Sequence, residues 1–83
     1  MWVRTQDDEL VNFDHVEFVR VEQDEDEGDF EVRAYPFQWI ESEDDVFYTL
    51  AERETHEAAH AVFQEVIGAL STGAAVLDLR PSP

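Results

Sequence analysis

Two histidines and a glutamate stand in the arrangement of a zinc hydrolase. His56, Glu57 and His60 match the pattern H-E-x-x-H. On a helix this spacing places the histidines one turn apart, where they hold zinc while the glutamate acts as general base. These residues therefore raise one enzymatic hypothesis, a zinc hydrolase built on His56, Glu57 and His60.

The sequence around the motif does not supply the rest of a zinc site. A catalytic zinc needs a third protein ligand, but Phe63 and Val66 occupy the places where the extended motif has glycine and histidine. Thr55 has the features of a helix N-cap, which would put His56 on a fraying first turn. We therefore interpret the match as coincidental and the histidines as residues flanking an apolar helix face. We expect a non-enzymatic protein with no catalytic residues, metal ligands or cofactor.

Carboxylates are dense at the predicted turns. Residues 24–29 have the oxygen density of a calcium loop, but Gly28 comes one residue too early for an EF-hand, so a solvated hairpin turn is the better interpretation. Similar clusters are formed by the acids of residues 7–9 and by Glu41, Glu43, Asp44 and Asp45. Together with Glu17, Glu22 and Glu31 on the strands, these carboxylates could form a face that mimics the phosphates of a nucleic acid.

The net charge of the whole chain is also strongly negative. Its 83 residues carry 21 acidic and 5 basic side chains, a formal charge of −16, and all five bases are arginine. We expect no direct binding of nucleic acid, because phosphates would be repelled. The charge suits a protein partner with a basic surface, or it keeps the protein soluble in a salty cytoplasm.

Composition also bounds the class of protein. Hydrophobic residues make up 43% of the chain and aromatic residues 12%, enough for a folded core. The lack of cysteine excludes disulfides and favours a reducing, cytoplasmic setting. No apolar run reaches the ~20 residues of a membrane span, and the N-terminus does not follow the pattern of a signal peptide. We expect no membrane partner.

An aromatic segment is the candidate binding surface. Tyr35, Phe37 and Trp39 surround Pro36 and precede a run of acids, so the segment either fills the core or forms a patch for a partner or a second copy of the chain. The candidate partner-binding residues are Tyr35, Phe37, Trp39, Glu41, Glu43, Asp44 and Asp45.

Five strands are predicted before the helix. Residues 2–5 and 9–12 read as a hairpin closed by the acids between them. Alternation and β-branched residues favour strands at 16–22 and 30–35, joined by the acidic turn at Gly28, where a positive φ is allowed. A fifth strand is predicted at 46–50.

One helix is predicted after Thr55, running to about Leu70. Its apolar residues recur at helical spacing and should form a single buried stripe of Ala59, Val62, Phe63, Val66, Ile67 and Leu70. Gly73 follows the helix, and residues 75–79 could return as a short edge strand. We therefore expect one α+β domain over residues 1–83, ordered over about 1–72 with a fraying tail. It would consist of an antiparallel sheet of four to five strands with one C-terminal amphipathic helix packed across it.

The opening of the chain, Met1-Trp2-Val3-Arg4-Thr5-Gln6-Asp7 with Leu10-Val11-Asn12, resembles a group of short uncharacterised bacterial and mobile-element proteins. The segment from Leu50 to Ala59 is similar to that group's helix start in its Thr, Glu and Ala positions, but lacks the group's Gly and Tyr. The resemblance spans about residues 1–70 and implies a small sheet with a helix. It implies no activity and no functional residues.

From the sequence we therefore expect a small acidic interaction protein that binds a protein partner with a basic surface, or a second copy of itself. The alternatives are a nucleic-acid mimic that inhibits a DNA-handling or defence protein, and the zinc hydrolase.

Overall fold

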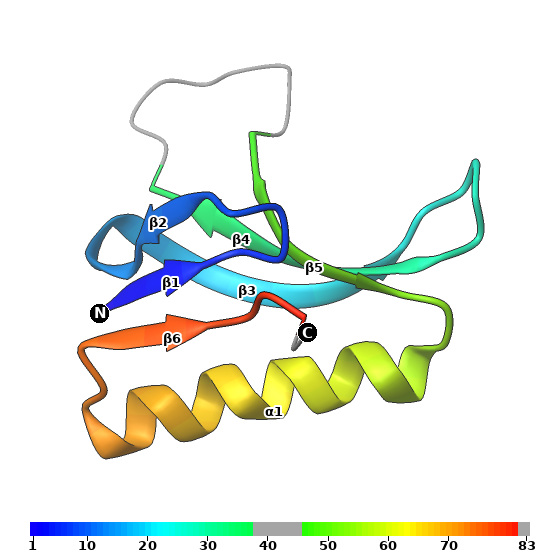
Figure 1. Ribbon diagram of the computed structural model, residues 1–83. Helices are drawn as coiled ribbons and strands as arrows, with labels where there is room; N and C mark the ends of the chain where they lie inside the picture. The colour runs from blue at the N-terminus through cyan, green and yellow to red at the C-terminus, as the bar shows by residue number, and fades with distance from the viewer. Residues whose placement is uncertain (38–45, 82–83) are drawn as a thin grey trace.

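The computed structural model describes residues 1–37 and 46–81, which form an α+β arrangement of strands around one long helix (Figure 1). The elements in chain order are β1 (Trp2–Arg4), β2 (Leu10–Asn12), a 3₁₀ turn (Phe13–His15), β3 (Val16–Gln23), β4 (Phe30–Pro36), β5 (Tyr48–Arg53), α1 (His56–Thr72) and β6 (Val76–Asp78).

These strands form two small sheets, so the expectation of a single antiparallel sheet of four to five strands is wrong. The first sheet has the order β2-β1-β6 and the second the order β3-β4-β5. β1 is antiparallel to β2 but parallel to β6, which only a long crossover through α1 allows. The 3₁₀ turn after β2 redirects the chain; there the side chain of Asn12 accepts a hydrogen bond of 3.0 Å from the amide of Asp14.

Both predicted hairpins are confirmed. Val3 pairs with Val11 in the first hairpin and Val21 with Val32 in the second, whose turn contains Gly28 at a φ of 79°. The predicted strand at 46–50 is displaced toward its C-terminal end, because β5 runs from Tyr48 to Arg53. The extra residues pair with the start of β4, where Phe30 lies opposite Arg53.

The helix has the predicted start and nearly the predicted end. The hydroxyl of Thr55 accepts a hydrogen bond of 3.1 Å from the amide of Ala58, and Gly73 closes the C-terminus at a φ of 70°. The phase of the buried face is rotated from the prediction. Ala59, Val62, Val66 and Ala69 are buried, whereas Ile67 and Leu70 are exposed and Phe63 is half-buried.

The core lies between the two sheets and is closed by α1. The first sheet contributes Val3 and Val11, the second contributes Val32, Ala34, Leu50 and Ala51, and the helix contributes Ala59, Val62 and Val66. Leu79, just after β6, completes this cluster, and its amide donates a hydrogen bond of 2.8 Å to the carbonyl of Arg4. The predicted edge strand after the helix is thus confirmed. In the described part of the chain, no helix is long and apolar enough to cross a membrane.

Candidate functional site

The two histidines of the H-E-x-x-H motif are exposed on the first turns of α1. Their ring centroids lie 6.1 Å apart; His56 meets the ring of Phe30 edge-on at 5.5 Å, and His60 stacks near Phe63 at 5.9 Å. Within residues 1–37 and 46–81, the group that brings three potential ligand atoms within 4.8 Å of one another is Glu27, Asp29 and Glu52. Neither histidine belongs to it. The described contacts of both histidines are with aromatic rings and, for His60, with Gln64.

Tyr35 does not lie on the surface, contrary to its place among the candidate partner-binding residues. Only 5% of it is exposed, because its ring stacks on Phe18 at 4.5 Å and contacts Phe47 at 5.7 Å. Phe37 is 56% exposed. The other candidates, Trp39, Glu41, Glu43, Asp44 and Asp45, lie outside the described residues.

The arginines are bound to groups of the same chain. Arg4 pairs with Asp8 at 2.6 Å and Arg80 with Asp78 at 2.7 Å. Arg33 contacts both Glu22 and Glu31 at 2.7 Å, and Arg20 contacts Glu22 at 2.5 Å. Within residues 1–37 and 46–81, most of the other carboxylates have no ion pair with an arginine.

Burial alone would lower the pKa of Arg33, but hydrogen bonding to Glu31 raises that pKa above its usual value. Its guanidinium also lies 4.2 Å from the ring centroid of Phe47. This group of charges sits on the face of the second sheet that points away from α1, and it holds the nearly buried carboxylate of Glu31 in place.

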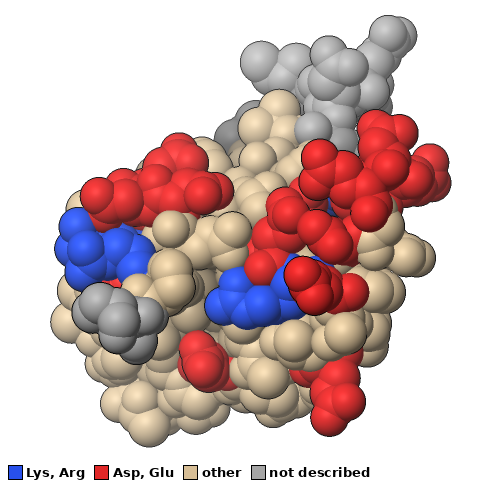
Figure 2. Space-filling model, turned by 45° about the vertical axis from the view of Figure 1, so that its right-hand side comes forward, with Lys and Arg blue, Asp and Glu red and all other residues tan. Residues whose placement is uncertain are grey.

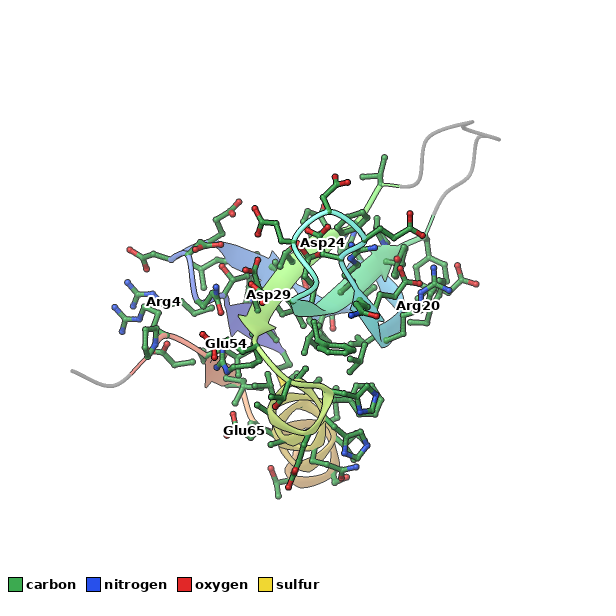
Figure 3. The ribbon with its side chains drawn as sticks, turned by 90° about the vertical axis from the view of Figure 1, so that its right-hand side faces the viewer. Arg4, Arg20, Asp24, Asp29, Glu54 and Glu65 are labelled. Atoms are coloured by element: carbon green, nitrogen blue, oxygen red, sulfur yellow. The ribbon has the colours of Figure 1, made fainter. Side chains whose placement is uncertain are left out.

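Carboxylates gather at one end of the molecule. The turn between β3 and β4 projects at the right-hand end of Figure 1, and the turn between β1 and β2 lies nearer the middle of the view. The right-hand side faces the viewer in Figure 3, with Asp24, Asp29 and Glu54. Figure 2 shows acidic side chains in groups on this side. We call this region the acidic end; its members are Asp7, Asp8, Glu9, Asp24, Glu25, Asp26, Glu27, Asp29, Glu52 and Glu54.

Gln6 and Glu52 connect the two turns of the acidic end. The side-chain oxygen of Gln6 accepts hydrogen bonds from the amide of Glu52 at 2.7 Å and from the guanidinium of Arg53 at 2.9 Å. The carboxyl of Glu52 in turn shares a hydrogen bond with Asp29. This bond, with desolvation and the charges of Asp29, Glu27 and Glu31, raises the pKa of Glu52. Crowding of carboxylates has therefore made one of them hold its proton more tightly.

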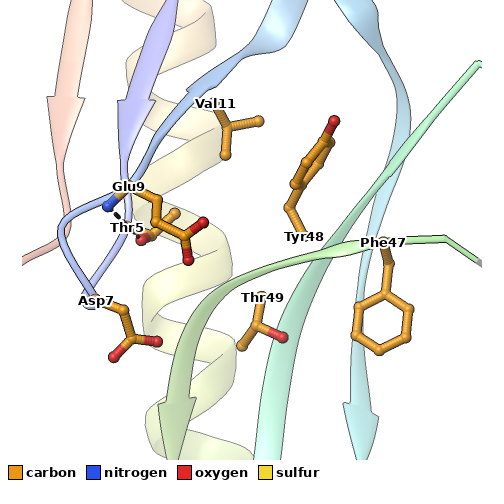
Figure 4. A pocket seen from close by; sticks show the side chains of 7 residues that line it. All are labelled: Thr5, Asp7, Glu9, Val11, Phe47, Tyr48 and Thr49. Atoms are coloured by element: carbon orange, nitrogen blue, oxygen red, sulfur yellow. Dashed lines mark hydrogen bonds between the residues drawn. The ribbon is translucent and has the colours of Figure 1, made fainter.

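A hollow of about 310 Å³ opens beside this end, between the β1–β2 turn and β5 (Figure 4). Asp7 and Glu9 line one side of it, and Tyr48 and Thr49 line the other. The hydroxyl of Thr5 accepts a hydrogen bond of 3.1 Å from the amide of Glu9 and so holds that part of the turn. An opening with carboxylates on one side and an aromatic residue on the other suits a cationic side chain.

Comparison of the chain with protein-family models, with curated proteins and with solved structures gave no match.

Sequence reasoning recognised the acids of each turn but missed that β5 joins them. It also missed the hollow, since Tyr48 and Thr49 meet Asp7 and Glu9 only through tertiary packing. In the sequence, the runs of acidic residues were the one available signal of this site.

Proposed function

We propose that this chain is a small, non-enzymatic interaction protein that binds a protein partner with a basic surface through its acidic end. The observation that carries the proposal is the crowding of Glu27, Asp29 and Glu52, whose carboxylate oxygens lie within 4.8 Å of one another. Arg4 pairs with Asp8 and Arg53 bonds to Gln6 at this end, whereas Arg20, Arg33 and Arg80 contact acids outside it. The acids of this end outnumber its arginines, so it creates a local negative potential. Such a potential steers a basic partner and speeds its association.

The hollow beside the acidic end supports a more specific contact. An arginine or lysine side chain of the partner would find the carboxylates of Asp7 and Glu9 on one side and Tyr48 on the other. Charge-assisted hydrogen bonds fix the position of such a side chain, whereas the more distant acids act mainly on the association rate.

Nucleic-acid mimicry stays as the second candidate, favoured by one observation. Two acidic turns that are far apart in the sequence, 7–9 and 24–29, are linked through β5, because the side chain of Gln6 accepts from the amide of Glu52, whose carboxylate lies within 4.8 Å of those of Glu27 and Asp29. A protein that handles DNA presents cations spaced to meet phosphates, and such a surface would accept this end.

The two candidates are tested with matched variants. Asp7→Asn with Glu9→Gln removes two negative charges at the hollow, and Glu57→Gln with Glu65→Gln removes two from α1. The tagged proteins are used to capture partners from a lysate at low and at high salt, and the captured protein is then purified for titration. The hollow variant should bind that protein about tenfold more weakly, and the α1 variant should bind nearly as the unchanged chain does.

Equal losses in both variants would show that only total charge matters and would contradict the proposed site. Binding that does not weaken as salt rises would contradict the role of charge. Addition of duplex DNA separates the candidates, because DNA displaces the chain from its partner only if both occupy the same surface.

A further inference from the structure

A second surface, remote from the acidic end, is apolar. A groove of about 280 Å³ lies between β3 and α1, lined by Phe13, Val16, Phe63, Ile67 and Leu70 among others. Ile67 is 41% exposed and Leu70 is 53% exposed, although both are large aliphatic residues. Glu17 is the acidic residue among those that line the groove. Exposed apolar surfaces of this kind are typical of sites that bind another protein, a membrane or a ligand.

β3 forms one wall of the groove and is an edge strand among the strands that the structure describes. It is an eight-residue strand that pairs with β4 on one side, and no described strand pairs with its other side. The corresponding edge of β5 is closed, because the amide of Gln6 donates to the carbonyl of Leu50 and its side chain accepts from the amide of Glu52. An open edge of this length is a template for pairing with another strand.

α1 forms the other wall and carries a regular stripe. His56, His60, Phe63, Ile67 and Leu70 follow one another at spacings of four, three, four and three residues, beside the buried line of Ala59, Val62, Val66 and Ala69. The stripe spans about 21 Å at the helical rise. Four-three spacing is the pattern by which one helix packs along another of its own kind.

We propose that a second copy of this chain covers the groove. In the dimer, β3 pairs antiparallel with β3 of the other copy, the two second sheets become one continuous sheet, and the α1 stripes face each other across the twofold axis. A twofold interface must be self-complementary, and an open strand edge and a four-three stripe each meet that condition.

The distribution of charge favours a second copy over a basic partner at this surface. The carboxylates gather at the acidic end, near the Gln23 end of β3, whereas the groove lies near its Val16 end. A basic partner would meet Glu17 here and little other charge, while a second copy brings a matching apolar surface. The net charge of −16 on each copy opposes the dimer, and salt screens that repulsion.

The test is sedimentation of the full chain over a range of protein concentrations at low and at high salt. We expect a monomer–dimer equilibrium that shifts toward dimer as salt rises. Binding of a basic partner at the acidic end should instead weaken with salt, so one proposal can fail without the other. A chain that stays monomeric at all concentrations and salts would overturn the dimer.

A pair of matched variants tests whether the stripe of α1 forms the dimer interface. Ile67→Glu puts a charge in the stripe and should weaken dimerisation about tenfold or more. Leu10→Glu adds the same charge at a leucine of β2 that is 62% exposed and does not line the groove, and it should change dimerisation little. Equal effects of the two variants, or a dimer unaffected by Ile67→Glu, would overturn the proposed surface. Leu70→Gln replaces Ile67→Glu if circular dichroism shows that the latter does not fold.

Hydrogen exchange tests the strand pairing itself. Amides of β3 that point away from β4 should exchange more slowly in the dimer than in the Ile67→Glu monomer. Unchanged exchange in β3 would overturn the pairing of the two β3 strands.

Discussion

The backbone amide of Gln6 donates a hydrogen bond of 3.0 Å to the carbonyl of Leu50, and this contact joins the turn of the first sheet to the edge of the second. The side chain of Gln6 reinforces it by accepting from Glu52 and Arg53. One residue thereby closes an open strand edge and holds the two acidic turns together.

Gln6→Ala should therefore destabilise the fold. The change leaves the amide of Glu52 and the guanidinium of Arg53 without their acceptor, at a cost of about 1 to 2 kcal/mol. Urea unfolding followed by circular dichroism measures the loss. Gln64→Ala, on the exposed side of α1, is the control and should change stability little. Equal losses in the two variants would show that the hydrogen bonds of Gln6 do not stabilise the fold.

The phase of α1 is tested by two neighbouring substitutions. Val66 is 2% exposed and packs in the core, so Val66→Ala should cost about 2 kcal/mol. Ile67→Ala should cost below about 0.5 kcal/mol when measured on dilute monomer at low salt. The reverse order would mean that α1 buries Ile67 and exposes Val66.

Arg33→Met tests the charges on the outer face of the second sheet. The substitution keeps the aliphatic stem but leaves Glu22 and Glu31 without the guanidinium that contacts both at 2.7 Å. The partly buried pair predicts a loss of about 2 kcal/mol at neutral pH. Thermal unfolding of the variant and the parent measures the loss. Arg80→Met removes an exposed pair and should leave the thermal midpoint nearly unchanged.

The raised pKa of Glu52 predicts a specific pH dependence. Because the folded state holds this proton more tightly than the unfolded state, the stability that Glu52 contributes is fully present below the ordinary value of 4.5 and is lost as pH rises through the folded pKa. Glu52→Gln keeps a donor toward Asp29 without the charge, so the variant should melt higher than the parent at neutral pH. The difference should vanish as pH falls below 4.5. Thermal melts of both proteins across this range measure it, with Glu65→Gln as the matched control.

The pKa of Asp78 is shifted in the opposite direction from that of Glu52. Hydrogen bonds from the side chain and backbone of Arg80 lower the pKa of Asp78 to about 2, so the stability it contributes is present above its usual value and is lost in strong acid. Asp78→Asn should lower the thermal midpoint slightly at neutral pH. In strong acid, near the lowered pKa of Asp78, it should leave the midpoint unchanged. A constant difference at all pH values would show that the effect is not electrostatic.

Features that depend on neighbours in the chain were predictable from the sequence. Thr55 and Gly73 mark the two ends of the helix, because each caps backbone groups that have no partner within the helix. Gly28 marks a hairpin turn, because glycine readily adopts a positive φ. The α+β class and both hairpins followed from such local rules. The net charge, and with it the expectation of a basic partner, needed only a count of residues.

Only the tertiary structure decided which strands pair, which face of α1 is buried and which distant acids lie close together. Nothing local to Val76 indicates that it lies beside Trp2, and the strands separate into two sheets because β1 takes β6 as its second neighbour. Ile67 and Val66 are both apolar, and only the position of α1 on the second sheet decides which of them is buried. Asp29 and Glu52 likewise stand far apart in the chain, and the carboxyl of Glu52 holds its proton more tightly because β4 and β5 bring the two together.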